Sequence, residues 1–208
     1  MSNRTEIINR ALVKIGANTI ATPGEESEQA RKAALVFKTL VQGELRRQAW
    51  SFAKKRATLA PLASPPGGQD YAEGYNLPND CLRLITLNGN WVFSSIRETN
   101  EGSLPSYAIE GRVLLTGNNR RATGGSSAYI VYVADVSDSI SVWDANFVEA
   151  FACRLATELV QSITKNMTLK QSLKQDYLEA LKEAKRTNAI ELPPQSLPDE
   201  SWVLARQW

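Results

Sequence analysis

Hydrophobic residues recur at helical spacing near both ends of the chain, whereas the middle has short apolar runs separated by turn residues. In the first segment Ile8, Leu12 and Ile15 lie three or four positions apart, which is the spacing of one helix face. Thr5 precedes this pattern as a cap, and Gly16 follows it as a stop. The pattern predicts a short first helix.

A second, longer helix is predicted over residues 25–48. Acidic residues come first, and Arg46 and Arg47 come last, which is the order that the helix dipole favours. A helix of roughly 24 residues would extend over about 36 Å. Its predicted apolar face consists of Ala30, Ala34, Phe37, Val41 and Leu45.

Two further helices are predicted in the last third of the chain, with a break at Lys165 and Asn166. Thr168 and Gln171 resemble a capping box that begins the fourth helix. The short connection makes the two helices antiparallel neighbours, and each is expected to pack on the first two helices. The third helix has the apolar stripe Phe147, Phe151, Leu155, Leu159 and Ile163, widened by Ala152 and Ala156, and the fourth has Leu169, Leu173, Tyr177, Leu181 and Ala184.

Residues 51–136 have the pattern of a small antiparallel sheet. Asn88-Gly89-Asn90 and Glu110-Gly111 each lie between two strand-like runs, which predicts two hairpins. The strand-like runs are residues 52–59, 82–87, 91–93, 107–109, 113–115 and 129–133.

The order of these elements predicts an α+β fold, namely an antiparallel four-helix bundle with an inserted small antiparallel β domain and an extended C-terminal arm. Residues 1–50 would form the first two helices, 51–136 the β insertion, 137–190 the last two helices and 191–208 the arm. Three prolines between positions 193 and 198 favour extended backbone in the arm.

The arm ends in aromatic and basic residues, since two of the five tryptophans lie in the last seven positions. Trp and Arg are enriched at the energetic centres of interfaces, so the arm suits docking on another chain better than folding back on its own helices. Trp50, Trp91 and Trp143 are instead expected in the core. The predicted docking residues are Trp202, Val203, Leu204, Arg206 and Trp208.

Composition excludes several classes of function. The 208 residues include no histidine, which excludes Ser-His-Asp and Cys-His nucleophilic sites and every metal motif that contains histidine. A net charge of +2 disfavours a strongly basic nucleic-acid binder. Cys81 and Cys153 are expected to be buried thiols in a reducing compartment. With neither a phosphate-binding glycine motif nor an apolar span, no cofactor, metal or membrane contact is expected.

Carboxylate pairs remain the only catalytic option. Asp70, Glu73 and Asp80 are close in sequence, as are Asp135 and Asp138. A glycosidase needs two carboxylates at a set separation in a cleft. Because 22 acidic residues will cluster by chance, solvated loop acids are the preferred interpretation.

The first sixty residues are the basic part of the chain, with 11 basic and 5 acidic residues. The run Lys54-Lys55-Arg56 has three interpretations: a solvated strand edge that discourages edge pairing, a channel wall facing DNA phosphates, or a surface for an acidic partner. The pair Arg120-Arg121, in a loop rich in Gly and Asn, has the same alternatives.

Two short motifs resemble a known family. WSFA (residues 50–53) closes the long second helix, and YNLPNDCLR (residues 75–83) follows a loop rich in Pro and Gly. Together with the paired C-terminal helices, they resemble the tail tubular protein A family of short-tailed, podovirus-type bacteriophages. These proteins are head-to-tail adaptors, also called gatekeeper or connector proteins. The resemblance covers most of residues 1–190.

The resemblance implies a structural virion protein, made in the host cytoplasm, with no required enzyme activity. It would form a ring, a dodecamer, that joins the portal protein to the tail nozzle protein while genomic DNA passes through the centre. The arm would dock on the portal or a neighbouring copy. The alternatives are a carboxylate-based polysaccharide hydrolase associated with the tail, and a non-specific nucleic-acid-binding module. Possible DNA-channel residues are Lys54, Lys55, Arg56, Arg120 and Arg121.

Overall fold

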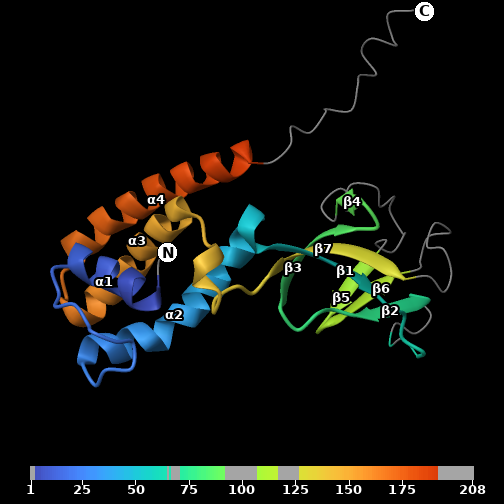
Figure 1. The fold of residues 1–208 in the computed structure, drawn as a ribbon, viewed down its shortest axis with the longest axis horizontal. Helices are drawn as coiled ribbons and strands as arrows, with labels where there is room; N and C mark the ends of the chain where they lie inside the picture. Colours follow the sequence, from blue (N-terminus) through green and yellow to red (C-terminus); the bar gives the residue numbers. More distant parts are fainter. Residues whose placement is uncertain (1–2, 65, 67–70, 92–106, 117–126, 192–208) are drawn as a thin grey trace, which may run out of the picture.

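The computed structural model describes residues 3–64, 66, 71–91, 107–116 and 127–191 of the chain. These residues form a helical lobe and a β lobe that lie side by side along the long axis of the molecule (Figure 1). The chain enters the β lobe after α2 and returns before α3. The helices are α1 (Arg4–Lys14), α2 (Glu28–Arg47), α3 (Ala145–Ile163) and α4 (Met167–Ile190), with the short 3-10 turns η1 (Ser51–Ala53) and η3 (Ile140–Val142).

The mixed α and β content is as predicted, but the predicted antiparallel four-helix bundle is wrong. α3 and α4 form a hairpin, and α1 and α2 each pack on α3. Among the described residues, the main helix contacts all involve α3, while α2 and α4 meet mainly where Tyr177 is bonded to Glu44 and Arg47. The reason lies in α3, which is apolar and buried around most of its circumference and therefore occupies the centre. The apolar stripe predicted from the sequence therefore includes fewer residues of α3 than the structure buries.

The described residues of the β lobe form two antiparallel sheets, whereas the sequence pattern predicts one. The first sheet has the strand order β1-β7-β3-β4 and the second has the order β2-β6-β5. The chain switches between the sheets after β1, β2, β4 and β6, and periodicity predicts a strand without telling which sheet it joins. The strands are β1 (Lys54–Leu59), β2 (Glu73–Asn76), β3 (Cys81–Leu87), β4 (Asn90–Trp91), β5 (Tyr107–Glu110), β6 (Val113–Thr116) and β7 (Ala128–Ala134).

Both predicted hairpins are confirmed. β3 and β4 are joined by Asn88 and Gly89, whose φ angles are 49° and 84°. A two-residue turn of this kind needs positive φ at both positions, which Asn and Gly adopt most readily. β5 and β6 are joined at Gly111, with a φ of 59°.

Two helices are capped by residues other than those predicted, and α2 begins at Glu28 rather than at residue 25. Asn3, rather than Thr5, caps α1, and Asn166, rather than Thr168 with Gln171, caps α4. Each Asn side chain accepts a hydrogen bond from a backbone N–H three residues later, at 2.8 and 3.0 Å. Asn is at least as good a cap as Thr, and in both helices it precedes the predicted cap.

One hydrophobic core runs from the helical lobe into the β lobe. Its centre is a cluster of aromatic rings on α2, α3 and the two segments that join the lobes. The ring of Phe147 lies 4.9 Å from that of Trp50 and 5.2 Å from that of Trp143. Trp50 and Trp143 are 1% and 7% exposed, which confirms their predicted place in the core, whereas the side chain of Trp91 lies outside the described residues.

The last turn of α4 is bound to the segment between α2 and β1. The Oδ1 atom of Asn188 accepts a hydrogen bond from the backbone N–H of Ser51 at 2.7 Å, and its Nδ2 atom donates to the carbonyl of Ala49 at 3.4 Å. The carboxylate of Glu191 accepts a hydrogen bond from the hydroxyl of Ser51. The end of α4 is thereby fixed beside the start of β1.

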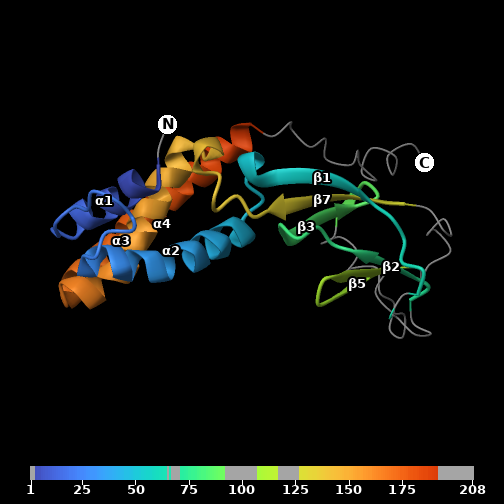
Figure 2. The ribbon, with the colours of Figure 1, turned by 60° about the horizontal axis from the view of Figure 1, so that its bottom comes forward.

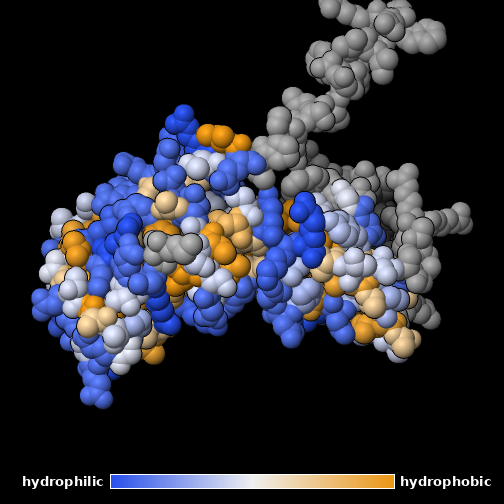
Figure 3. Space-filling view, in the orientation of Figure 1, coloured by the Kyte–Doolittle hydropathy of each residue, from blue (hydrophilic) through white to orange (hydrophobic). Residues whose placement is uncertain are grey.

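The surface of the helical lobe is mostly hydrophilic on the face shown in Figure 3. Apolar residues on this face lie in small groups between polar ones. Within the described ranges, none of the helices combines the length and the apolar character that a membrane span requires.

Candidate functional site

The pleat of β1 divides the basic run Lys54-Lys55-Arg56 between two faces of the sheet. Residues that are paired across antiparallel strands point to the same face, and successive residues point to opposite faces. Lys55 is paired with Tyr132, whereas Lys54 is paired with Val133 and lies on the other face together with Arg56. The three cations predicted as one group therefore do not act together.

On its face, Lys55 is neutralised by a carboxylate. Its Nζ atom lies 2.7 Å from Oδ2 of Asp80, and the hydroxyl of Tyr132 donates to Oδ1 of Asp80 at 3.0 Å. Burial alone would raise the pKa of Asp80, but the hydrogen bonds from Lys55 and Tyr132 outweigh it and lower that pKa. Burial and the bond to Asp80 raise the pKa of Tyr132 to about 12.

The opposite face of the four-stranded sheet carries a basic patch built from both lobes. Arg83 on β3 is paired with Val133 and so shares the face of Lys54 and Arg56. Arg46 reaches the same region from the last turn of α2, where its guanidinium donates to the carbonyl of Leu82 at 2.8 Å. We call Arg46, Lys54, Arg56 and Arg83 the basic face.

Like charges crowd one another on the basic face. Burial lowers the pKa of Lys54, and the neighbouring Arg56 lowers it further. The pKa of Arg83 is lowered by burial and then by Arg46. In the part of the chain that the structure describes, Arg46, Lys54 and Arg56 form no ion pair with a carboxylate. Such a patch attracts anions such as phosphates.

Sequence reasoning missed Arg46 and Arg83 as members of this face. Alternation along β1 is enough to separate Lys55 from Lys54 and Arg56. No pattern in the sequence shows that β3 lies two strands away from β1, or that α2 ends against β3. Of the other predicted basic residues, Arg120 and Arg121 lie outside the described residues, as do all five predicted docking residues: Trp202, Val203, Leu204, Arg206 and Trp208.

The carboxylates proposed for catalysis are tied to separate partners. Asp70 lies outside the described residues, and Glu73 accepts a hydrogen bond from the hydroxyl of Tyr75 at 2.7 Å. Asp135 accepts one from Nε2 of Gln42, also at 2.7 Å. Asp80 has a lowered pKa, whereas the general acid of a glycosidase needs a raised one.

The two cysteines are free thiols, buried at Cys153 and half-buried at Cys81. Burial raises the pKa of both thiols, which lowers the fraction of reactive thiolate. The described residues contain no group of three or more Cys, Asp or Glu side chains placed to hold a metal ion.

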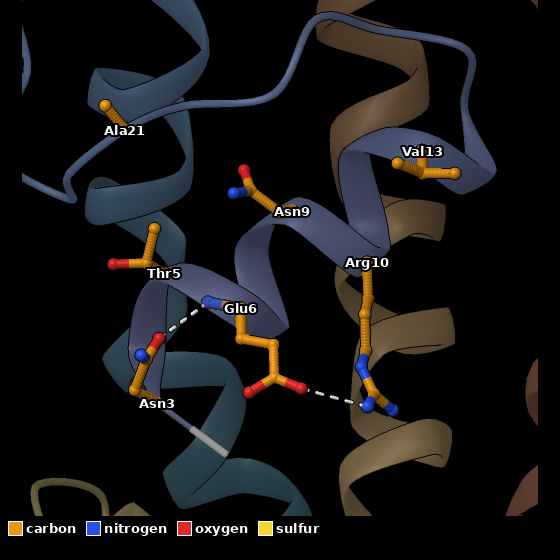
Figure 4. A pocket seen from close by; sticks show the side chains of 7 residues that line it. All are labelled: Asn3, Thr5, Glu6, Asn9, Arg10, Val13 and Ala21. Atoms are coloured by element: carbon orange, nitrogen blue, oxygen red, sulfur yellow. Dashed lines mark hydrogen bonds and ion pairs between the residues drawn. The ribbon is translucent and has the colours of Figure 1, made fainter.

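A shallow depression with a volume of about 540 Å³ lies beside α1 (Figure 4). Four of its polar side chains, those of Asn3, Glu6, Asn9 and Arg10, are bonded to other side chains or to the backbone. Glu6 pairs with Arg10 at 3.0 Å, and Asn9 exchanges two hydrogen bonds with the backbone of Ile20. These contacts fasten the segment after α1, and they leave no converging set of groups for catalysis. The lining residues are Asn3, Thr5, Glu6, Asn9, Arg10, Val13 and Ala21.

No protein-family model matches the chain, and no curated protein matches it either. The functional argument therefore depends on the motifs of the sequence and on the geometry of the described residues.

Proposed function

We propose that this protein is a structural head-to-tail adaptor of a bacteriophage neck. It forms a ring that joins the portal protein to the tail nozzle protein and lets genomic DNA pass during ejection. The resemblance of residues 50–53 and 75–83 to the tail tubular protein A family supports this proposal. The two-lobed, elongated shape also suits a subunit that contacts one partner at each end (Figure 1).

The basic face is the structural observation that carries the proposal. It places four cations together on one side of a chain whose net charge is only +2. A DNA conduit needs phosphates to be tolerated without being held, because tight binding would oppose ejection. A small local patch on a nearly neutral chain meets this condition. The affinity for DNA grows with the number of phosphates that the protein neutralises, and four cations neutralise only a few.

Weak DNA binding that depends on the basic face is the expected consequence. Replacing Arg56 with Gln should reduce the slope of log affinity against log salt by about one, because one phosphate contact is lost. Replacing Lys55 with Gln removes the same charge from the same strand, but this lysine already pairs with Asp80. That control should leave the slope unchanged. Both slopes are obtained by measuring the affinity of each variant for random-sequence duplex DNA at a series of salt concentrations.

If the two variants had equal slopes, the basic face would not be the surface that contacts DNA.

The adaptor function itself is tested separately, by co-expressing the chain with the portal protein of the same phage and purifying through a tag on the portal. Retention of the chain on the portal supports the proposal. A folded chain that is never retained would contradict it.

A further inference from the structure

The two tyrosines of β7 lie on opposite faces of the four-stranded sheet. Tyr132 is 4% exposed and belongs, with Ile130, to the core that this sheet shares with Leu114 of the second sheet. Tyr129 is 40% exposed and lies three positions earlier, an odd step that reverses the face. Figure 2 shows β1, β7 and β3 on one side of the β lobe and β2 and β5 on the other. Tyr129 therefore lies on the outer face of the sheet, away from the second sheet.

The outer face of the sheet also carries the basic face. Tyr129 is paired with Thr58, and Arg56 lies two positions before Thr58, on the same side of β1. Diagonal neighbours across two antiparallel strands are about 7–8 Å apart, which long and aromatic side chains can bridge. Arg56 and Tyr129 are such neighbours, and both side chains are exposed. An aromatic ring and a cation therefore lie side by side on one open surface.

The fold itself makes little use of the Tyr129 ring. In the part of the chain that the structure describes, no other aromatic ring packs on Tyr129 and no cation lies over it. Tyr132, by contrast, is buried and donates its hydroxyl to Asp80. A single exposed tyrosine needs no explanation by itself. Its position beside the cations of the basic face is what points to a ligand.

A ligand that uses the whole of this surface has to combine negative charge with a flat ring. Nucleic acid does so, because its phosphates suit basic residues and its bases stack on aromatic side chains. Along a duplex the bases are stacked on one another and offer no free face, whereas a single strand exposes them. The carboxylates of an acidic protein would pair with the cations but would leave the tyrosine without a partner. The combination therefore favours a single strand.

We infer that the outer face of the four-stranded sheet binds single-stranded nucleic acid, with one base stacked on Tyr129 and a neighbouring phosphate beside Arg56. This inference deepens the proposed DNA contact of the basic face and rests on it. A duplex that passes along this face meets only the cations, whereas a strand with unpaired bases also meets the tyrosine. The surface therefore holds a single strand more tightly than its phosphates alone would require.

The test compares two fluorescently labelled strands of the same length and charge: oligothymidine, and an abasic strand that has the phosphates but no bases. Anisotropy gives the affinity of the full-length chain for each. We expect the wild type to bind oligothymidine about tenfold more tightly, which is within the range for one base stacked on an aromatic ring. Tyr129→Leu should bind both strands alike. Tyr129→Phe is the matched control, because it keeps the ring and should retain the preference.

Arg56→Gln separates this inference from the contact on which it rests. It should weaken the binding of both strands by the same factor, because both contain the same phosphates. Equal affinities of the wild type for the two strands, or a preference that persists in Tyr129→Leu, would overturn the inference and leave the basic-face contact in place. A chain that bound neither strand would contradict both, while retention on the portal tests the adaptor function independently.

Discussion

Replacing Phe147 with Ala is expected to lower the free energy of unfolding by about 3–5 kcal/mol. This side chain is 1% exposed and lies at the centre of the aromatic cluster, in contact with the rings of Trp50, Phe52, Trp143 and Phe151. Truncation removes the buried ring and leaves a cavity that large, interlocked neighbours cannot fill by relaxing. Urea denaturation of the variant beside the wild type measures the loss.

The control for this variant is Leu178→Ala on α4. Leu178 is 47% exposed, so its truncation should change the free energy of unfolding by less than about 0.5 kcal/mol. If both variants lost the same small amount, Phe147 would not hold the central position that the structure gives it.

Replacing Glu44 with Leu is expected to cost about 2–3 kcal/mol of stability. Glu44 is 3% exposed, and its carboxylate accepts a hydrogen bond from the hydroxyl of Tyr177 at 2.8 Å. Arg154 and Arg47 lie 3.6 and 3.8 Å from the same carboxylate. Burial, followed by the bond to Glu44, raises the pKa of Tyr177. Leucine keeps the volume but leaves this hydroxyl and two guanidinium groups without their shared acceptor.

Glu158→Leu provides the matched control, because Glu158 pairs with the same Arg154 at 3.6 Å but is 46% exposed. Exposed ion pairs contribute little, so its loss should cost less than about 1 kcal/mol. Thermal or urea unfolding of both variants gives the comparison. Equal losses of unfolding free energy in the two variants would show that burial does not increase the contribution of Glu44 to stability.

Local patterns in the sequence predict the helices and most strands, because each depends on residues close together in the chain. The turn at Asn88 and Gly89 follows from two residues whose backbone preference is strong. The residue at which a helix begins is harder to predict, because Asn166 and Thr168 are both good caps and lie two positions apart. Here the earlier residue forms the cap.

The arrangement of the elements could not be predicted in the same way. Whether Phe147 and Leu155 lie on a single buried stripe or on a helix buried around most of its circumference depends on what surrounds α3, which the spacing does not record. The same holds for the basic face, where Arg83 joins Lys54 only because β3 and β1 pair with β7 from opposite sides. Alternation along β1 predicts that Lys55 lies on the opposite face from Lys54 and Arg56. No local pattern predicts that its partner is Asp80.

The most direct test of the adaptor proposal is the mass of the complex between this chain and the portal protein of the same phage. Native mass spectrometry of the co-purified complex counts the adaptor copies on each portal ring. We expect a portal ring that carries one complete, symmetric set of adaptor chains. A properly folded chain that gives only the masses of the free portal and the free chain would contradict the proposal.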